Sequence, residues 1–237
     1  REYMGSSKEE WGRVRAFGFS MYLGGNLSSG LLQVVTLPEF TLPFLSQFAP
    51  TAKVAKELAR SIGLTTSILG KSGIKWINSL QGKGEKLPDI YLLFDPKDAR
   101  IVKSLTEDER GATNRAWNEG YITAKQTLEH AGMDPAERIS PFKQKNFHVR
   151  EILATTFNIF ETSSRYAAFL TAYRLAQDPA VRAKAAEVMQ SSKLWQQKFG
   201  NNPTAYDIAA FTVEETFGVY GKLDRPDYMR GFGSALF

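Results

Sequence analysis

The feature that most constrains this chain is an apolar stretch from Ala16 to Ala52, which carries a single charged residue, Glu39. Charged residues make up 23% of the whole chain, so a long segment with only one of them is expected to be buried. Because glycine and proline interrupt helices, the stretch predicts a broken helical hairpin in the core near the N-terminus. The interruptions are Gly24, Gly25, Gly30, Pro38 and Pro43.

A membrane span is the alternative interpretation of the same stretch. A spanning helix needs about 20 consecutive apolar residues. Pro38 has no amide hydrogen and disfavours helix at Leu37, and Pro43 repeats the interruption. The hairpin is therefore favoured. The alternative that stays open is a segment that is buried in one state and meets lipid in another, with the glycine and proline breaks as hinges.

Composition limits the classes of protein to which the chain can belong. Its 237 residues suffice for one large domain or two small ones. A net charge of +5 permits contact with nucleic acid or anionic lipid without requiring either. The absence of cysteine excludes disulfides and thiol chemistry. An arginine at position 1 and an apolar end at 231–237 suggest a piece of a longer polypeptide.

Downstream of the apolar stretch, spacing and capping patterns predict regular helices. The first predicted helix starts at Thr51 and has Val54, Leu58 and Ile62 on its buried face. The second starts after a Thr106 cap, runs to about Ala131 and stops at Gly132. The other predicted helices are 147–177, 180–190 after an Asp178-Pro179 cap, and 204–220 after an Asn202-Pro203 cap. The candidate for a short strand is 90–94, which prolines bound on both sides.

These patterns predict an all-α fold, an irregular bundle of about seven to nine helices with a Gly/Pro-broken apolar helical hairpin near the N-terminus. We expect residues 1–237 to form one helical domain or segment of a much longer polypeptide. A loop over 81–100 is the candidate point of subdivision. It would separate a hairpin region (1–80) from a helical bundle (101–237).

The sequence carries no strong signature of catalysis or metal binding. Gly70-Lys71-Ser72 resembles the end of a phosphate-binding loop but lacks the required upstream glycine and the preceding strand. His130 and His148 have no acidic residue placed to form a metal pair on a helix. We therefore expect no catalytic residue, no cofactor and no metal in this segment, whatever the parent polypeptide does.

Paired charges on the predicted helices have structural interpretations. Glu161 and Arg165 lie four residues apart. If exposed, they form an ion pair worth a few tenths of a kcal/mol, and if buried, they fix how the helix packs. Glu214 and Glu215 are adjacent, so they are expected on different faces of their helix, with one of them in solvent.

A basic connector provides the candidate contact with nucleic acid. Lys143, Lys145 and Arg150 alternate with aromatic residues, and no acidic residue intervenes before Arg150. Such a pattern can contact phosphates and stack on bases. A solvated connector is the structural alternative and explains the same residues.

Three segments occur in a distinctive order along the chain. The first, Gly25-Asn26-Leu27-Ser28-Ser29, precedes an apolar run and a turn at Pro38 and Pro43. The second, Glu161-Thr162-Ser163-Ser164-Arg165, is followed by an alanine-containing helix to Tyr173. The third is Arg225-Pro226-Asp227-Tyr228-Met229-Arg230-Gly231. Together they resemble the large polyvalent (PLxRFG-type) proteins of short-tailed bacteriophages, with Ser164 where the family tends to have asparagine and Arg230-Gly231 departing from the Arg-Phe-Gly order.

The resemblance implies an internal virion protein that is ejected with the genome and helps form a conduit into the host. It implies copies of itself and other virion proteins as partners, with packaged DNA and, after ejection, membrane as further contacts. The implied locations are the virion interior and then the host cell envelope. Asn26, Pro38 and Pro43 are then expected to shape the hairpin, and Arg225 and Arg230 to hold the C-terminal motif. The alternatives are a non-catalytic helical part of a virion RNA polymerase or cell-wall hydrolase, and a DNA-binding module.

Overall fold

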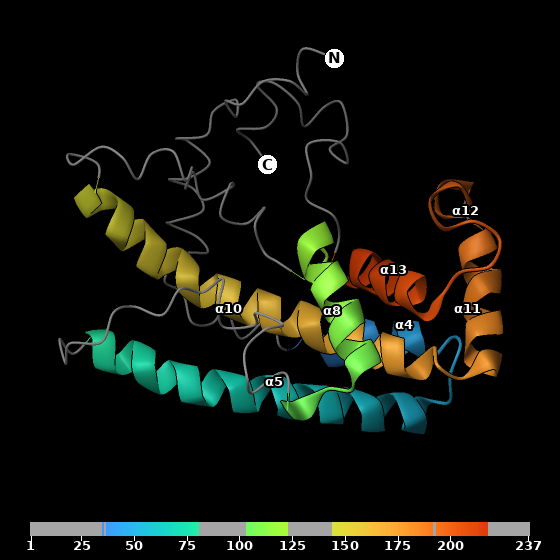
Figure 1. Cartoon of the computed structure of the whole chain (residues 1–237), viewed down its shortest axis with the longest axis horizontal. Coiled ribbons are helices and arrows are strands. Elements are labelled where there is room, and N and C mark those ends of the chain that lie inside the picture. Colours follow the sequence, from blue (N-terminus) through green and yellow to red (C-terminus); the bar gives the residue numbers. More distant parts are fainter. Residues whose placement is uncertain (1–34, 36, 81–102, 123–143, 192, 218–237) are drawn as a thin grey trace, which may run out of the picture. The chain divides into compact units, whose positions relative to one another are not determined.

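The computed structural model describes residue 35 and residues 37–80, 103–122, 144–191 and 193–217. Every regular element in these ranges is helical (Figure 1), which confirms the predicted all-α multi-helix fold. The predicted loop over 81–100 and the candidate strand within it lie outside the described residues.

The chain divides into two compact units. One comprises Gln33–Thr123 and Thr162–Gly218, and we refer to it as the larger unit. The other comprises Arg1–Leu32, Ala124–Glu161 and Val219–Phe237. Its described part is the beginning of α10, so the packing described below is that of the larger unit. The predicted subdivision at 81–100 stays a prediction.

The larger unit begins with the C-terminal arm of the predicted hairpin. The arm consists of a π-helix, η1 (Leu37–Thr41), followed by α4 (Leu42–Leu45). Pro38 lies in the wide turn of η1. Pro43 lies in the first turn of α4, where a missing amide hydrogen is tolerated. The helical course of the arm therefore continues through both prolines. The buried residues of the arm are Leu37, Thr41 and Leu45, and Phe48 and Ala49 are buried directly after it.

None of the helices in the described ranges combines the length and the apolar character that crossing a bilayer requires. The earlier part of the apolar stretch, residues 16–34, lies outside those ranges.

The long helix α5 (Thr51–Leu80) starts at the predicted residue. Its buried side chains in the described part recur at intervals of three and four residues, as one face of a helix requires. The predicted face included Ile62, which is half-buried, whereas the neighbouring Ser61 is fully buried. Ser61 falls on the face shared by Leu58 and Thr65, and its hydroxyl accepts a hydrogen bond from Arg174 across the helix interface. The buried residues are Val54, Leu58, Ser61, Thr65 and Ile68.

Helix α8 (Glu107–Glu119) starts with the predicted cap but ends earlier than predicted. The Thr106 hydroxyl accepts from the amide of Glu109, and the Glu109 carboxylate accepts from the amide of Thr106, which together form a capping box. The prediction that the helix continues to Ala131 was wrong. Gly120 adopts a left-handed conformation with φ of 86° and ends the helix there.

The left-handed glycine gives a testable prediction about stability. Replacing Gly120 with Ala is expected to lower the free energy of unfolding by about 1–2 kcal/mol, because a side chain is strained in the left-handed region. The matched control is Gly111→Ala in the same helix, where an added Cβ meets no atom within 4 Å. That control is expected to raise the free energy by about 0.5–1 kcal/mol. Urea denaturation of both variants measures the two effects, and equal shifts would contradict the assigned role of Gly120.

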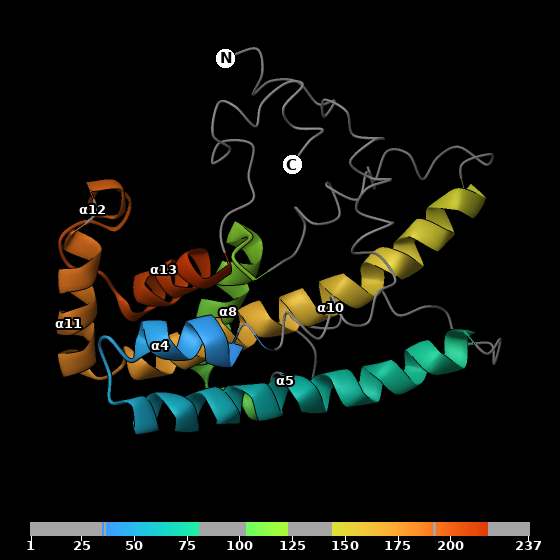
Figure 2. The same cartoon turned by 180° about the vertical axis from the view of Figure 1, so that it is seen from behind.

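The helix α10 (Gln144–Leu175) is enclosed on all sides in its second half. Every residue from Thr162 to Ala172 is buried, whereas a helix at a protein surface buries one face. Alanines and small hydroxyl residues dominate this segment, so neighbouring helices approach it closely. The buried hydroxyl of Thr171 donates to the carbonyl of Ala167 at 2.7 Å, which satisfies it within the helix. Figure 2 shows this half of α10 between α5 and α13.

Three shorter helices complete the larger unit. They are α11 (Pro179–Gln190), α12 (Lys193–Phe199) and α13 (Ala205–Phe217). The predicted Asp178 cap of α11 is confirmed, since its carboxylate accepts from the amide of Ala180. The cap of α13 is Thr204 rather than the predicted Asn202, because Thr204 and Asp207 exchange hydrogen bonds between side chain and backbone.

Contacts between distant segments hold these helices together. The ammonium of Lys53 lies 2.8 Å from the carboxylate of Asp178, which joins the start of α5 to the start of α11 over 125 residues of sequence. Aromatic rings join the hairpin arm to the C-terminal helices, with Phe44 against Phe211 at 5.5 Å and Trp195 against Phe211 at 4.7 Å. The larger unit is therefore one packed body built from non-consecutive parts of the chain.

Candidate functional site

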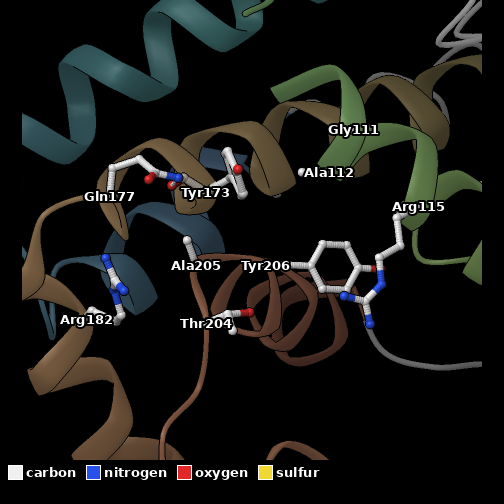
Figure 3. A pocket seen from close by; sticks show the side chains of 9 residues that line it. All are labelled: Gly111, Ala112, Arg115, Tyr173, Gln177, Arg182, Thr204, Ala205 and Tyr206. Atoms are coloured by element: carbon white, nitrogen blue, oxygen red, sulfur yellow. Dashed lines mark hydrogen bonds between the residues drawn. The ribbon is translucent and has the colours of Figure 1, made fainter. Parts of the chain in front are cut away.

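A pocket of about 340 Å³ opens to solvent between α8, the end of α10, α11 and the start of α13 (Figure 3). Arg115 and Arg182 stand at its opposite ends, so we call it the two-arginine pocket. Tyr173 and Gln177 form one wall, and Thr204 and Ala205 line the other. The lining residues are Gly111, Ala112, Arg115, Tyr173, Gln177, Arg182, Thr204, Ala205 and Tyr206.

The two tyrosines of the pocket rest on one buried ring. Phe169 has no exposed surface and stacks on Tyr173 with ring centroids 6.3 Å apart. The same ring meets Tyr206 edge-to-face at 5.7 Å. Such aromatic pairs each contribute about 0.5–1.5 kcal/mol beyond the area they bury. Phe169 therefore fixes the positions of both tyrosine side chains from below.

At one end of the pocket, Glu119 organises Arg115 and Tyr206. Its carboxylate accepts from Nε of Arg115 at 2.7 Å and from the hydroxyl of Tyr206 at 2.6 Å. The Arg115 guanidinium also lies 3.9 Å from the centroid of the Tyr206 ring. Burial raises the pKa of Glu119, but these two hydrogen bonds outweigh it and hold the pKa below its usual value. Glu119 is therefore ionised at neutral pH and balances the charge of Arg115.

At the other end, Arg182 is held by the backbone rather than by an acid. Its Nε donates to the carbonyl of Ala176 at 3.2 Å, at the C-terminal end of α10. Gln177 folds back in the same turn, with its side-chain amide donating to the carbonyl of Tyr173. In the part of the chain that the structure describes, Arg182 forms no ion pair. Its two terminal nitrogens keep their hydrogen-bond donors for a ligand.

A buried ion pair links the helices behind the pocket. Nε of Arg174 lies 2.6 Å from the Glu109 carboxylate, and both side chains are about nine-tenths buried, at 9% and 11% exposed. Arg174 also donates to the Ser61 hydroxyl at 3.2 Å, so α5, α8 and α10 meet at one guanidinium. Burial raises the pKa of Glu109, but hydrogen bonds from Arg174 and Thr106 outweigh it and lower the pKa.

A second cluster surrounds the ammonium of Lys198 on α12. Three aromatic rings, those of Trp195, Phe199 and Tyr121, have centroids 5.2–5.3 Å from its Nζ. The ammonium also pairs with the buried carboxylate of Glu214. Burial lowers the pKa of Lys198, but the hydrogen bond to Glu214 outweighs it and raises the pKa. The cluster joins α12 to α13 and to Tyr121, which follows the end of α8.

The structure places five of the predicted motif residues. Tyr173 lines the pocket. Glu161 and Arg165 are buried on α10, and a guanidinium nitrogen of Arg165 lies 3.5 Å from the carbonyl of Tyr121. Pro38 and Pro43 are exposed on η1 and α4. The functional roles predicted for these residues stay predictions.

The remaining predicted residues are not placed with their side chains. Lys145 and Arg150 belong to the beginning of α10, where the structure gives the helix only. The predictions for Asn26, Lys143, Arg225, Pro226, Arg230 and Gly231 fall outside the described residues.

Sequence reasoning missed the residues that define the pocket. Arg115 and Glu119 lie four residues apart, a spacing that indicates a helical ion pair and was visible in the sequence. Arg182 and Tyr206 carry no local signal, because the fold brings them together.

The adjacent acids behave as predicted: Glu214 is buried, whereas Glu215 is exposed and its carboxylate accepts a hydrogen bond from the indole of Trp195.

The described residues include no group of three or more histidine, aspartate or glutamate side chains that could hold a metal ion. The side chains that line the pocket offer guanidinium, amide, hydroxyl and aromatic groups to a ligand. Comparisons of the chain with protein-family models, curated proteins and solved structures found no match.

Proposed function

We propose that this chain is a helical structural segment of an internal virion protein of a short-tailed bacteriophage. The protein is ejected with the genome and helps to form the conduit for its delivery into the host. The segment itself is non-enzymatic. Its partners are copies of itself and other virion proteins, with packaged DNA and the host envelope as further contacts.

The observation that carries the proposal is the order of the three motifs along the sequence. They begin at Gly25, Glu161 and Arg225, and each resembles the corresponding segment of the polyvalent phage proteins. The resemblance expects a helix at the second motif, and residues 161–173 belong to α10. Glu161 and Arg165 are both buried there, which favours a packing role over a surface ion pair.

The physical properties of the chain support passage through a narrow portal. A protein that is ejected must rearrange or unfold and then fold again. The absence of cysteine removes the covalent crosslinks that would oppose threading. Individual helices form from local contacts within microseconds. Contacts such as Lys53 with Asp178, over 125 residues, would re-form later, after the helices.

Mass spectrometry of purified virions tests the proposal. We expect abundant peptides from residues 37–80 and 144–191, derived from a parent polypeptide longer than 237 residues. After infection, the same peptides are expected in the host envelope fraction, while the major capsid protein stays with the emptied particles. Absence of these peptides from particles, with synthesis inside infected cells, would contradict ejection.

The DNA-binding alternative has its own measurement. If the basic connector contacts DNA, affinity falls steeply between about 50 and 200 mM salt, because each phosphate contact releases counterions. Replacing Lys143, Lys145 and Arg150 with Ala should then reduce both the affinity and the salt dependence. A charge-matched control replaces three exposed lysines elsewhere, Lys56, Lys103 and Lys184. Equal losses from both triple variants would indicate non-specific attraction to the net charge.

A further inference from the structure

We infer that the two-arginine pocket binds a carboxylate carried on a short apolar or aromatic body. This inference is independent of the proposed role in the virion. It follows from the charge balance of the pocket, from the geometry of its donors and from the character of its walls.

The charge balance leaves one cation for a ligand. Arg115 is neutralised by Glu119 at 2.7 Å, and Asp207 adds a further negative charge on that side. Arg182 is the pocket cation that lacks an acidic partner among the described residues. One uncompensated positive charge matches a ligand with one negative charge.

The donor geometry at Arg182 selects a planar anion. Nε is held on the carbonyl of Ala176, so the orientation of the guanidinium is fixed before a ligand arrives. The two terminal nitrogens present parallel donors, and a carboxylate accepts such a pair through both oxygens. A phosphate monoester carries a charge of about −1.5 to −2 at neutral pH. Its second charge would meet no second cation of the pocket lining, since Arg115 stands at the opposite end and is paired with Glu119.

The same acids disfavour nucleic acid as the occupant. A phosphodiester chain brings several negative charges to one surface. Here Asp108 acts electrostatically on Tyr173, and Glu119 and Asp207 act on Arg115. Neighbouring phosphates would be repelled by these three carboxylates, whereas a single carboxylate seated on Arg182 would not extend to them.

The walls between the two arginines combine aromatic and methyl surface with the polar groups of Gln177 and Thr204, which suits a compact aromatic body. Ala112 and Ala205 contribute methyl groups, and Tyr173 and Tyr206 contribute rings whose positions Phe169 fixes. A volume of about 340 Å³ lies at the lower end of the range for small-molecule sites. Figure 3 shows Arg182 at one end and the two tyrosines farther along the pocket, so a ligand such as 3-phenylpropionate with its carboxylate at Arg182 would direct its ring toward the tyrosines.

Calorimetric titration of the purified protein at pH 7 tests the inference. The probes are 3-phenylpropionate, the neutral 3-phenylpropionamide and inorganic phosphate. We expect saturable binding of 3-phenylpropionate at one site, and at least about tenfold weaker binding of the amide, because it lacks the charge-assisted hydrogen bonds. Equal binding of acid and amide, equal binding of phosphate, or no saturable binding of 3-phenylpropionate would overturn the inference.

Variants locate the site. Arg182→Met is expected to weaken binding of 3-phenylpropionate by about tenfold or more. The control Lys184→Met removes an exposed charge from the same helix and is expected to leave binding unchanged. Ala205→Leu fills the pocket without changing any charge and is expected to block binding, so the test stands even if Arg182→Met unfolds the protein. Unchanged binding in a folded Arg182→Met or Ala205→Leu variant would refute the assignment.

The source of the carboxylate is distinguished by a further probe. Acetyl-Gly-Phe with a free carboxylate represents the C-terminus of a peptide, and its amidated form is the control. Competition by the free peptide acid identifies a peptide terminus as a fitting ligand. Binding of 3-phenylpropionate without such competition identifies a free small carboxylic acid. Competition by the amidated peptide at equal concentration would contradict recognition of a carboxylate.

Discussion

Replacing Arg174 with Met is expected to lower the free energy of unfolding by about 3–5 kcal/mol. The guanidinium joins three helices, with a bond of 2.6 Å to Glu109 on α8 and of 3.2 Å to Ser61 on α5. Methionine fills the space of the arginine stem but leaves the Glu109 carboxylate buried without its counter-ion. Urea denaturation at pH 7 measures the loss.

A second substitution separates the lost charge pair from lost packing. Adding Glu109→Gln to Arg174→Met is expected to recover part of the stability, because glutamine removes the uncompensated charge and still serves the capping box with Thr106. The control for exposed pairs is Arg60→Met, whose partner Glu57 lies 3.6 Å away on the same helix. That change is expected to cost less than about 1 kcal/mol. Absence of recovery in the double variant would contradict the role of the charge.

The same pair predicts how stability depends on pH. Folding lowers the pKa of Glu109, so its contribution is present above the ordinary carboxyl pKa and is lost as the pH falls through the lower, folded value. Without Arg174, burial instead raises the pKa of Glu109, which then takes up a proton at higher pH. The stability deficit of Arg174→Met should therefore be largest near neutral pH and should shrink on acidification. A deficit that is constant with pH would contradict this account.

Replacing Phe169 with Ala is expected to cost about 3–5 kcal/mol. The ring is fully buried and supports both Tyr173 and Tyr206, so its removal leaves a cavity beneath the pocket and frees two aromatic neighbours. Phe169→Leu keeps most of the volume and should cost less while still loosening the tyrosines. Urea denaturation gives the energies, and near-ultraviolet circular dichroism reports the order of the rings.

The matched control for Phe169 is a phenylalanine at the surface. Phe40 on η1 is 53% exposed, so Phe40→Ala is expected to change the free energy of unfolding by no more than about 0.5 kcal/mol. Similar losses for Phe40→Ala and Phe169→Ala would show that ring size rather than burial determines the cost.

Local signals in the sequence identified most of the helices in the described ranges and several of their starting residues, but not α12. Thr106 and Asp178 cap helices as predicted, because capping depends on residues within one turn. The end of α8 was mispredicted, since Gly120 and Gly132 carry the same local signal. At Gly120 the amide of Tyr121 bonds back to the carbonyl of Ala116, and the next residue, Ile122, is fully buried. The core position of Ile122 therefore favours the earlier glycine.

Tertiary contacts explain why the rest was not predictable. Ser61 rather than Ile62 is buried on α5, and the partner of its hydroxyl is Arg174, 113 residues later in the sequence. The pocket depends on similar long-range contacts: the hydroxyl of Tyr206 donates a hydrogen bond to the carboxylate of Glu119, 87 residues away in the sequence. One of the nine lining residues, Tyr173, was identified in advance, through a motif rather than through its neighbours. Residues that act together only after folding leave no periodic trace in a single sequence.

The enclosure of α10 has a consequence for the order in which the larger unit comes apart. From Thr162 to Ala172 the helix presents no face to solvent, so its backbone amides can exchange with water only after neighbouring helices depart. The seven-residue α12 exposes Gln196 and Gln197 and is held to α13 mainly through Trp195 and Lys198, so it can detach before α10 opens. Under mechanical tension, the enclosed part of α10 would unfold in a single step, after outer helices such as α12 had detached.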